Sequence, residues 1–504
     1  MLKKICTFYI SLFVLLYIFP NSDLVSNNQF GSHLDINSAD SLKNIQNLQY
    51  SINSILNDKN LQNANYGLTV YSITNNKFYY KRNSDKLLTP ASNTKLFTSF
   101  ACLSYLGEDF NTRTSVFCNS NAISGNKLNG NVYLFGRGDI NLGISDIEDL
   151  AQQIKNYGIN EINGNVCADA TFFDADYYRK SYSGDNEEVE ATGPIHPISV
   201  EKNLINVLVK AGSLTGKPAN IQIIPSSTSF EVRNNTLVGY ARKKKKASTI
   251  SVRITTENQK TIISVSGTIP PKQTGYYSYF NNAPALTAAG VLKERLAVVG
   301  VKVNGAVVNA KIDKSNPKNI FEIASFDRPI TDIMYWVNKK SDNFLAEMLF
   351  KIVGGNYGKY PSTAQSAREV ILKALDTNKI ARNNFVLNDG CGLSRRNLVT
   401  SEGLVQLLAT AKHKPFGGVL DSTLAIAGVD GTLRKRMSGT LAANNLRAKT
   451  GTLRNVSSLA GYVRTLNGEL LAFAFIFNGP SVGYYKQTEN KIGELLANFQ
   501  FLKY

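Results

Sequence analysis

Histidine is scarce in this chain of 504 residues, which has only His33, His196 and His413. His33 lies in a polar N-terminal tract, His196 between Ile195 and Pro197, and His413 in the basic segment AKHKP. None belongs to an HExxH pattern or stands near a second histidine. A hydrolase with a Ser-His-Asp triad needs histidine as its base. The sequence therefore argues against that class, and a hydrolase of this sequence needs another group to move the proton.

Cysteine is also sparse and shows no metal-binding spacing. Apart from Cys6, the chain has Cys102, Cys118, Cys167 and Cys391, at wide intervals and without a CxxC pair. This pattern does not support a zinc site, and we expect neither a metal nor another cofactor. Small buried thiols are the favoured interpretation. A disulfide is permitted outside the cytosol, but the spacing does not select a pair.

Negative charge is in deficit. The chain has 56 Lys and Arg against 38 Asp and Glu, a net charge of +18. Such a balance favours an anionic partner such as nucleic acid, acidic lipid or an acidic polymer, although basic residues that simply solvate the surface explain it equally well. The densest run is RKKKK at residues 242–246, with no aromatic RNA-binding pattern or finger spacing nearby. We expect a hairpin tip or loop there, and no nucleic-acid partner.

Long hydrophobic runs are missing except at the N-terminus. The segment MLKKICTFYISLFVLLYIFP has two lysines followed by an apolar run, which is the pattern of a secretory signal. It is short for a membrane span. No good small-x-small cleavage site follows, so a cleaved signal and an uncleaved anchor over residues 1–22 both stay open. We expect the remainder to be exported and soluble.

The chain is too long for one ordinary core, so two or three domains are expected. An amphipathic helix, two strands (YGLTVYSI and KFYYKR) and a second helix from Ser92 or Asn93 to about Tyr105 come first. Short strands with Gly, Asn and Pro turns then dominate residues 111–280. Helices return after residue 281, and SSLAGYVRTLNGELLAFAFIFN forms a hairpin at Asn467-Gly468.

This order predicts an α/β (α+β) main domain made of residues 38–110 and 281–504. We expect an antiparallel sheet with flanking helices, in which the first and last strands of the chain pair. A β-rich insertion of one or two small domains, residues 111–280, interrupts it, with a division near residue 193.

Ser92 and Lys95, in TPASNTKLF, are the first candidate site residues. Three positions apart on a helix, their side chains share one face. The partial positive charge at a helix N-terminus favours an alkoxide and disfavours a second cation, so a buried Lys95 could lose its proton and accept that of Ser92. Taken alone, an N-capping serine and an exposed lysine explain the pair better. The same spacing recurs at Ser124/Lys127 and Ser315/Lys318.

Ser341-Asp342-Asn343 lies between two amphipathic segments, ITDIMYWVNKK and FLAEMLFKIV. The Ser341 hydroxyl can relay a proton between a leaving group and a lysine, and Asn343 can hold a substrate amide. A helix N-cap is the structural alternative.

Lys449-Thr450-Gly451, followed by Thr452, precedes a strand-like segment. Lys449 offers charge to a terminal carboxylate, Thr450 and Thr452 offer hydrogen bonds, and Gly451 leaves room for an extended peptide. An ordinary turn is the alternative.

The three motifs occur in the order typical of class A β-lactamases and penicillin-binding proteins. From about residue 40 to the C-terminus, the chain resembles the low-molecular-mass class C penicillin-binding proteins, which are serine D-alanyl-D-alanine carboxypeptidase/endopeptidases. The blocks LTPASNTKLFTSFACL, VNKKSDNFLAEML and LRAKTGTLRNVSSLAGYV carry the resemblance, together with the long separation of the first two motifs. It implies a penicillin-binding/β-lactamase-like domain.

The resemblance also implies roles for the candidate residues. The penultimate D-Ala of a peptidoglycan stem peptide would acylate Ser92, with Lys95 as base and Ser341 as proton shuttle. Asn343 and the segment from Lys449 to Thr452 would bind substrate, and the backbone N–H groups of Ser92 and Thr452 would form an oxyanion hole.

The partners implied by the resemblance are stem peptides ending in D-Ala-D-Ala and β-lactam inhibitors. The location would be the periplasm or the extracytoplasmic cell envelope, and the role cell wall remodelling. Because the chain is positively charged, we also expect peripheral contact with the cell wall or an anionic membrane surface.

Two positions depart from the family pattern: Cys391 stands in NDGCGLSRRN where serine is usual, and Arg137 in LFGRGDINL where glycine is usual. We expect Cys391 near the site, so that thiol reagents would affect activity. Two other functions stay open, a β-lactamase-like or D-amino-acid peptidase with the same serine, and a non-catalytic wall-binding protein. The intact motifs argue against the second.

Overall fold

The computed structural model of the chain describes residues 39–500, except 186–189, 191, 241–247, 314, 316 and 359. The signal or anchor segment predicted at residues 1–22 and the loop predicted at residues 242–246 lie outside the described residues. Among the helices that are described, none combines the length and the apolar character that a membrane crossing requires.

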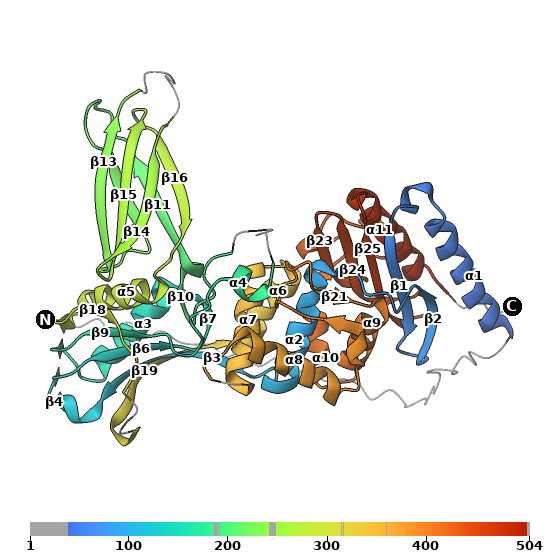
Figure 1. The fold of residues 1–504 in the computed structure, drawn as a ribbon, viewed down its shortest axis with the longest axis horizontal. Coiled ribbons are helices and arrows are strands. Elements are labelled where there is room, and N and C mark those ends of the chain that lie inside the picture. Colours follow the sequence, from blue (N-terminus) through green and yellow to red (C-terminus); the bar gives the residue numbers. More distant parts are fainter. Residues whose placement is uncertain are drawn as a thin grey trace, which may run out of the picture.

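A six-stranded antiparallel sheet brings the two ends of the described chain together (Figure 1). β1 pairs with β25 along its whole length, with Leu68 opposite Phe475. The predicted pairing of first and last strands is therefore confirmed, and so is the closing hairpin, because β24 and β25 are direct neighbours. The order is β2 (Lys77–Arg82), β1 (Asn65–Ser72), β25 (Leu470–Asn478), β24 (Val456–Arg464), β23 (Arg447–Leu453) and β22 (Ala425–Ile426).

Helices cover both faces of this sheet, which explains the nearly continuous apolar sequence of β25. Successive side chains of a strand point to opposite faces. Phe473, Phe475 and Phe477 accordingly join the core under α1 (Ala39–Leu56) and α11 (Val482–Ala497). Ala474 and Ile476 join the opposite core, where α9 (Ser401–Lys412) contacts β25 and β1.

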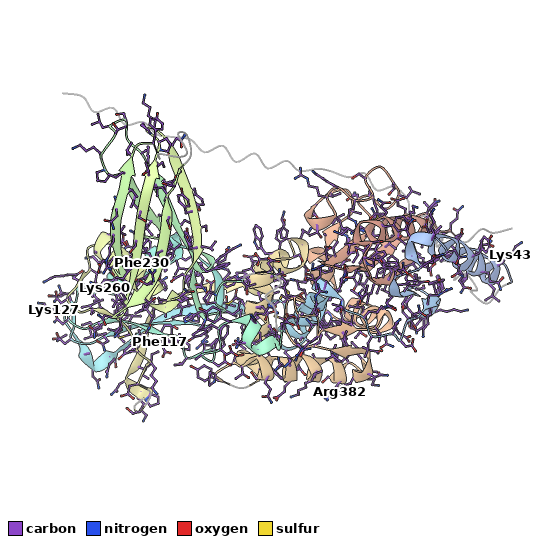
Figure 2. All side chains as sticks on the ribbon, turned by 45° about the horizontal axis from the view of Figure 1, so that its top comes forward. Lys43, Phe117, Lys127, Phe230, Lys260 and Arg382 are labelled. Carbon is purple, nitrogen blue, oxygen red and sulfur yellow. The ribbon has the colours of Figure 1, made fainter. Side chains whose placement is uncertain are left out.

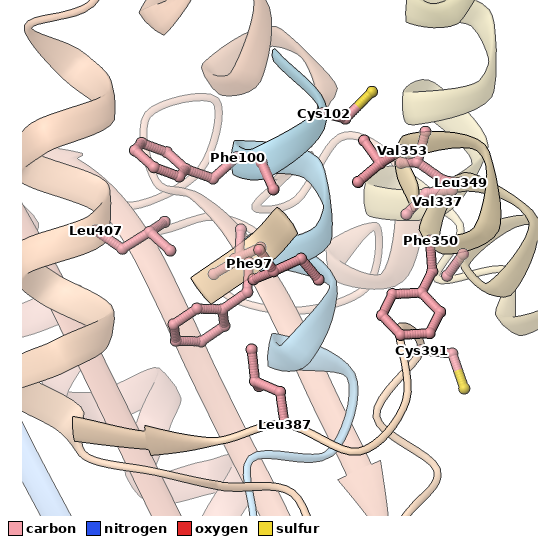
Figure 3. Close-up of a cluster of buried hydrophobic side chains, with 14 of the residues drawn as sticks. Phe97, Phe100, Cys102, Val337, Leu349, Phe350, Val353, Leu387, Cys391 and Leu407 are labelled. Carbon is pink, nitrogen blue, oxygen red and sulfur yellow. The ribbon is translucent and has the colours of Figure 1, made fainter. Parts of the chain in front are cut away.

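The second core surrounds α2 (Thr94–Leu106), the helix that follows Ser92. Figure 3 shows Phe97 and Phe100 of α2 among side chains from several neighbouring elements. An apolar surface on all sides requires a helix to be buried. The helices that contact α2 include α6 (Ile330–Lys339), α7 (Asn343–Tyr357), α8 (Ala364–Thr377) and α9.

The loop after β20 (Phe385–Val386) lies directly on α7. A Cβ atom on Gly390 would come within 2.5 Å of the Cβ atom of Phe350, so only glycine fits between loop and helix. Phe350 therefore supports the backbone that passes beside Lys95. β20 pairs with β21 (Leu398–Val399), and α10 (Gly417–Thr423) packs on α6 and α9.

Between α2 and α6 the chain forms a second sheet, with α3 (Ile144–Asn156) and α5 (Pro284–Val298) in contact with it and with each other. The strand order is β18 (Val307–Asn309), β9 (Val166–Asp169), β6 (Val132–Gly136), β3 (Asn111–Asn119) and β19 (Ile320–Pro329). Short strands complete this region: β4 (Ile123–Ser124), β5 (Lys127–Leu128), β7 (Asp139–Leu142), β8 (Glu161–Ile162), β10 (Ile198–Val200) and β17 (Lys302–Val303).

The expected return to the main domain at residue 281 needs a correction. Strands β17, β18 and β19 pair with β8, β9 and β3 of the inserted segment, and Leu292 and Leu296 of α5 are buried in the same core. We propose instead that the main domain resumes near Ile330, where α6 begins. Strands of two or three residues carry too little alternation to be recognised in the sequence.

Residues 204–280 form a sandwich of two three-stranded sheets around their own apolar core (Figure 1). This core begins with Ile205, somewhat later than the division expected near residue 193, which stays a prediction. One sheet has the order β12 (Asn220–Ile224), β11 (Leu204–Lys210) and β16 (Thr274–Phe280), and the other β13 (Phe230–Val238), β15 (Lys260–Ile269) and β14 (Ser251–Glu257).

Phe350→Ala is expected to lower the free energy of unfolding by about 3–5 kcal/mol, the usual cost of removing a buried phenylalanine. Phe350 is fully buried, and the single tryptophan, Trp336, lies on the neighbouring α6. Urea unfolding followed by tryptophan fluorescence therefore reports on this helical unit. Leu441→Ala is the control, because Leu441 is 51% exposed, and should change the free energy by less than about 0.5 kcal/mol. Equal losses in the two variants would contradict this packing.

Candidate active site

Ser92 lies in a 3-10 turn, Ala91–Asn93, that leads directly into α2. The N-cap position of α2 is Asn93, but its side chain makes no capping hydrogen bond. Instead, Asn93 Nδ2 donates to Ser458 Oγ at 2.7 Å, and Ser458 Oγ donates to the Pro90 carbonyl at 2.6 Å. The turn is thus fixed to the central strand β24, and the Ser92 hydroxyl is not used as a cap.

Lys95 is fully buried on the first turn of α2. Its Nζ donates to Ser92 Oγ at 3.0 Å, to Asn343 Oδ1 at 2.7 Å and to the Cys391 carbonyl at 2.6 Å. Burial lowers the pKa of Lys95, and the nearby acidic groups oppose this effect only in part. The contacts therefore place an amine with a depressed pKa against the candidate nucleophile.

Ser341 lies between α6 and α7 with a φ of 60°. The alternative that it caps α7 is wrong, since the N-cap is Asp342, whose Oδ1 accepts the Leu345 N–H at 3.0 Å. The Ser341 hydroxyl instead accepts a hydrogen bond from Lys449 Nζ at 2.8 Å. Asn343, two residues later, bonds Lys95, so this short motif connects both lysines.

Lys449 is the second fully buried lysine of the site and lies on β23. Its Nζ donates to Ser341 Oγ and to the Thr450 carbonyl, the latter at 2.9 Å. Burial holds the pKa of Lys449 well below its usual range, and the charge of Lys95 lowers this pKa further. The turn considered as an alternative for KTG is wrong, because residues 447–453 are a paired strand.

The remaining residues of this motif lie on the same strand with different surroundings. Thr450 Oγ1 donates to Thr432 Oγ1 at 2.8 Å, and Thr452 is exposed. A Cβ atom on Gly451 would come within 2.2 Å of Ser458 Oγ and 2.5 Å of the Pro90 carbonyl oxygen. The room that Gly451 leaves is therefore taken by the protein itself, where we had expected the substrate.

The loop 389–394 is the part of the site whose function the sequence analysis missed. Gly392 has a φ of +88°, and a Cβ atom there would lie 2.0 Å from the Ala91 carbonyl oxygen. Asp389, fully buried, accepts the N–H groups of Gly392 and Ser394, each at 2.8 Å. The loop is thereby held against the Ser92 turn, and its Cys391 carbonyl reaches Lys95. The signal that the sequence offered was the pair of glycines, Gly390 and Gly392, on either side of Cys391 in NDGCGLSRRN.

Glu347 of α7 is a buried carboxyl group beneath this loop. Its Oε1 accepts the N–H groups of Gly390 at 2.8 Å and Cys391 at 2.6 Å, and its Oε2 accepts the Tyr182 hydroxyl at 2.7 Å. Burial raises the pKa of Glu347 to about 7, and the nearby Asp389 adds to the shift. In the sequence Glu347 is only one polar residue of an amphipathic helix, so nothing identified it.

Cys391 lies near the site, as expected, but its thiol is fully buried, with Sγ 3.7 Å from Asp389 Oδ2. Burial holds the pKa of this thiol well above its usual range, so the expected sensitivity to thiol reagents is not supported by the thiol's surroundings. Possible ligand atoms of Glu347, Asp389 and Cys391 lie within 4.8 Å of one another. Both carboxylates already accept several hydrogen bonds, so this group is satisfied without an ion.

The inserted segment contributes to the site through α4 (Arg179–Ser183) and the residues that follow it. Arg179, almost fully buried, pairs with Asp389 at 3.1 Å and with Asp185 at 2.6 Å. Glu190 Oε2 accepts Asn343 Nδ2 at 2.8 Å. Arg137, the other departure from the family pattern, lies over the Phe135 ring in the inserted segment, 5.6 Å from its centroid.

The structure thus brings the three motifs together, although they are far apart in the sequence. Ser92, Lys95 and Asn343 form one hydrogen-bonded group, and Ser341 and Lys449 form a second. Thr450, Gly451 and Thr452 follow Lys449 on the same strand, β23.

A model of the D-Ala-D-Ala carboxypeptidase 3 (S13) family matches residues 48–499 of the chain. The D-alanyl-D-alanine carboxypeptidase of Actinomadura sp. (strain R39) is 30% identical over 466 residues, which cover 90% of this chain and 85% of that protein. The D-alanyl-D-alanine carboxypeptidase DacB of Haemophilus influenzae is 27% identical, with 83% of this chain and 86% of that protein covered.

The crystal structure of penicillin binding protein 4 (dacB) from Haemophilus influenzae superposes with a TM-score of 0.71 at 24% identity, covering 89% of this chain and 99% of that chain. It therefore shares the fold predicted from the motifs. The family resemblance is confirmed, and with it the prediction of a serine-type carboxypeptidase: the chain belongs to the D-Ala-D-Ala carboxypeptidase 3 (S13) family.

Proposed function

We propose that the protein hydrolyses the bond between the last two residues of peptidoglycan stem peptides that end in D-Ala-D-Ala. The observation that carries the proposal is the 3.0 Å contact between Ser92 Oγ and the Nζ of Lys95, a lysine that is fully buried and has a lowered pKa. A serine beside a neutral amine is an activated nucleophile. Among the described residues, no histidine forms a hydrogen bond with Ser92, and Lys95 is the base in contact with its hydroxyl.

In the acylation step, Lys95 takes the proton of Ser92 as Ser92 Oγ attacks the carbonyl carbon of the penultimate D-Ala. The backbone N–H groups of Ser92 and Thr452 stabilise the resulting oxyanion, a contribution of about 3–4 kcal/mol for a typical donor. Ser341 then donates a proton to the leaving amine and takes one from Lys449, which is protonated when the substrate carboxylate is bound, and the terminal D-Ala departs. The 2.8 Å contact between Ser341 and Lys449 supports this relay.

In the second step, water attacks the carbonyl carbon of the acyl group and loses a proton through Ser341 to Lys449. Lys95 returns its proton to Ser92 Oγ, and the shortened stem peptide leaves as a carboxylic acid. Lys449, with Thr450 and Thr452 on the same strand, binds the terminal carboxylate, whose negative charge restores the protonated form of Lys449. Asn343 holds the amide of the peptide. Penicillins acylate the same serine and remain attached when deacylation is slow.

The proposed place of action is the periplasm or the extracytoplasmic cell envelope, because the polymeric substrate lies there. The N-terminal segment with signal character and the net charge of +18, which suits an anionic cell wall or membrane surface, support this location. Hydrolysis of cross-linked peptides at the same serine, an endopeptidase activity, uses the same chemistry on a different leaving amine.

Ser92→Ala is expected to abolish both labelling by a fluorescent penicillin and release of D-Ala from a muramyl pentapeptide. Ser124→Ala is the matched control, because Ser124 and Lys127 have the same spacing but lie in short strands of the inserted segment. It should behave as the wild type does. Labelling of Ser92→Ala would disprove the nucleophile. Comparing D-Ala release with hydrolysis of a cross-linked dimer distinguishes carboxypeptidase from endopeptidase activity.

Acylation by penicillin is expected to rise with pH through the lowered pKa of Lys95, since only the neutral amine accepts a proton. Burial favours the neutral amine, so the midpoint of this rise should lie below the ordinary lysine value near 10.5. Lys95→Arg keeps the charge but does not deprotonate, and should lose at least about a hundredfold in rate at all pH values. A wild-type rate in Lys95→Arg would rule out Lys95 as the base.

Glu347→Gln is expected to move the rise in acylation to lower pH, because the negative charge of Glu347 raises the pKa of Lys95. Glutamine keeps an oxygen for the N–H groups of Gly390 and Cys391, so the loop should be retained. Glu489→Gln is the control: Glu489 is equally buried but pairs with Arg436. That variant should leave the pH profile unchanged. Identical profiles for Glu347→Gln and the wild type would show that Glu347 is only structural.

A further inference from the structure

Three connecting segments meet at one end of the β-sandwich formed by residues 204–280. Backbone hydrogen bonds hold them together: Gly216 N–H to the Val238 carbonyl at 2.8 Å, Gly239 N–H to the Ile269 carbonyl at 2.9 Å, and Lys272 N–H to the Gly212 carbonyl at 3.0 Å. The exposed side chains of Lys210, Leu214, Lys217, Tyr240 and Lys272 belong to this end, and we call them the sandwich tip.

The tip points away from the rest of the molecule. Figure 2 shows Phe230 and Lys260, the first residues of the parallel strands β13 and β15, at the end of the sandwich near the other inserted sheet. Their last residues, Val238 and Ile269, therefore lie at the opposite end, which Figure 1 places far from the central sheet and from Ser92 on the turn before α2. A partner at the tip would leave the active site open.

Charge is distributed unevenly along the sandwich. Its two acidic residues are Glu231, the second residue of β13, and Glu257, which pairs with Lys260 across the β14–β15 turn. Both therefore lie at the end near the other inserted sheet. The segments at the tip contain no acidic residue. Across the described residues, Lys210, Lys217 and Lys272 are exposed and form no ion pair.

Apolar side chains lie among these lysines. Leu214 is 67% exposed and Tyr240 is 61% exposed. A soluble anionic polymer needs only the positive charges, whereas a bilayer surface takes up exposed Leu and Tyr side chains at the level of its headgroups. The combination of cations and apolar anchors on one protruding end therefore favours a bilayer.

We propose that the sandwich tip binds the surface of a bilayer that contains anionic phospholipids, with the three lysines at the headgroups and Leu214 and Tyr240 in the interface. The inference rests on the proposed function, because it places the enzyme outside the cytosol between a membrane and the cell wall. Bound through the tip, the enzyme is held at the membrane while its active site lies a sandwich length away from the lipid.

The test uses protein produced without residues 1–22, so that this apolar segment cannot itself bind lipid, and follows its sedimentation with vesicles of phosphatidylcholine alone or with one quarter phosphatidylglycerol. We expect binding only to the vesicles with phosphatidylglycerol, and weaker binding as salt is raised. Lys210→Gln/Lys217→Gln/Lys272→Gln should weaken it by at least about tenfold, since each lysine near such a surface contributes on the order of 1 kcal/mol.

The matched control is Lys318→Gln/Lys379→Gln/Lys414→Gln, which removes three exposed lysines elsewhere and changes the net charge equally. Its vesicle binding should match the wild type. Leu214→Ser/Tyr240→Ser should weaken vesicle binding but leave binding to dextran sulfate unchanged. Equal losses in the two lysine variants, or no effect of the apolar pair on vesicle binding, would overturn the proposal.

Penicillin labelling separates this proposal from the proposed function. All variants of the tip and the control should label at the wild-type rate, because none of these residues lies near Ser92. A wild type that binds vesicles but does not label would disprove the function and leave the membrane contact in place. A wild type that labels but does not bind vesicles would disprove the membrane contact alone.

Discussion

The site depends on two buried lysines, each hydrogen-bonded to a serine, and the surrounding structure must replace the water that their amines lose. Taking an ammonium group out of water is costly unless polar partners replace the water. Lys95 has the Cys391 carbonyl and Asn343, and Lys449 has the Thr450 carbonyl. Burial favours the neutral amine of both lysines, and the charge of Lys95 lowers the pKa of Lys449 further. A neutral amine beside a hydroxyl is the state from which serine chemistry can begin.

The fold supplies this environment by fixing backbone that is distant in sequence to the turn before α2. Ser458 on the central sheet bonds the Pro90 carbonyl, and Gly392 approaches the Ala91 carbonyl too closely for any side chain. Glu347 on α7 holds the loop 389–394 in place by accepting the N–H groups of Gly390 and Cys391. The inserted segment is part of the same arrangement, because Arg179 neutralises the buried Asp389. The site therefore depends on the insertion as well as on the main domain.

The sequence predicted the parts whose chemistry is local. The contact between Ser92 and Lys95 follows from their spacing, although Ser92 lies in the 3-10 turn before α2 and not on the helix itself. The closing hairpin follows from its turn residues, and the ordered motifs predicted the family. The roles of Glu347 and Gly451 depend on which backbone lies opposite, and a single sequence does not contain that information. The boundary expected at residue 281 failed for a related reason: β17 and β18 are two or three residues long and exist only through their pairing with the insertion.

The most direct test of the central claim is the titration of Lys95 itself, followed by NMR of protein labelled with 13C at the lysine ε-carbons. The spectrum of Lys95→Arg assigns the signal by its loss. A Lys95 that titrates clearly below the ordinary lysine value near 10.5 is the result we predict, because burial disfavours its charge. A Lys95 that stays protonated up to that value would contradict a lysine base at Ser92.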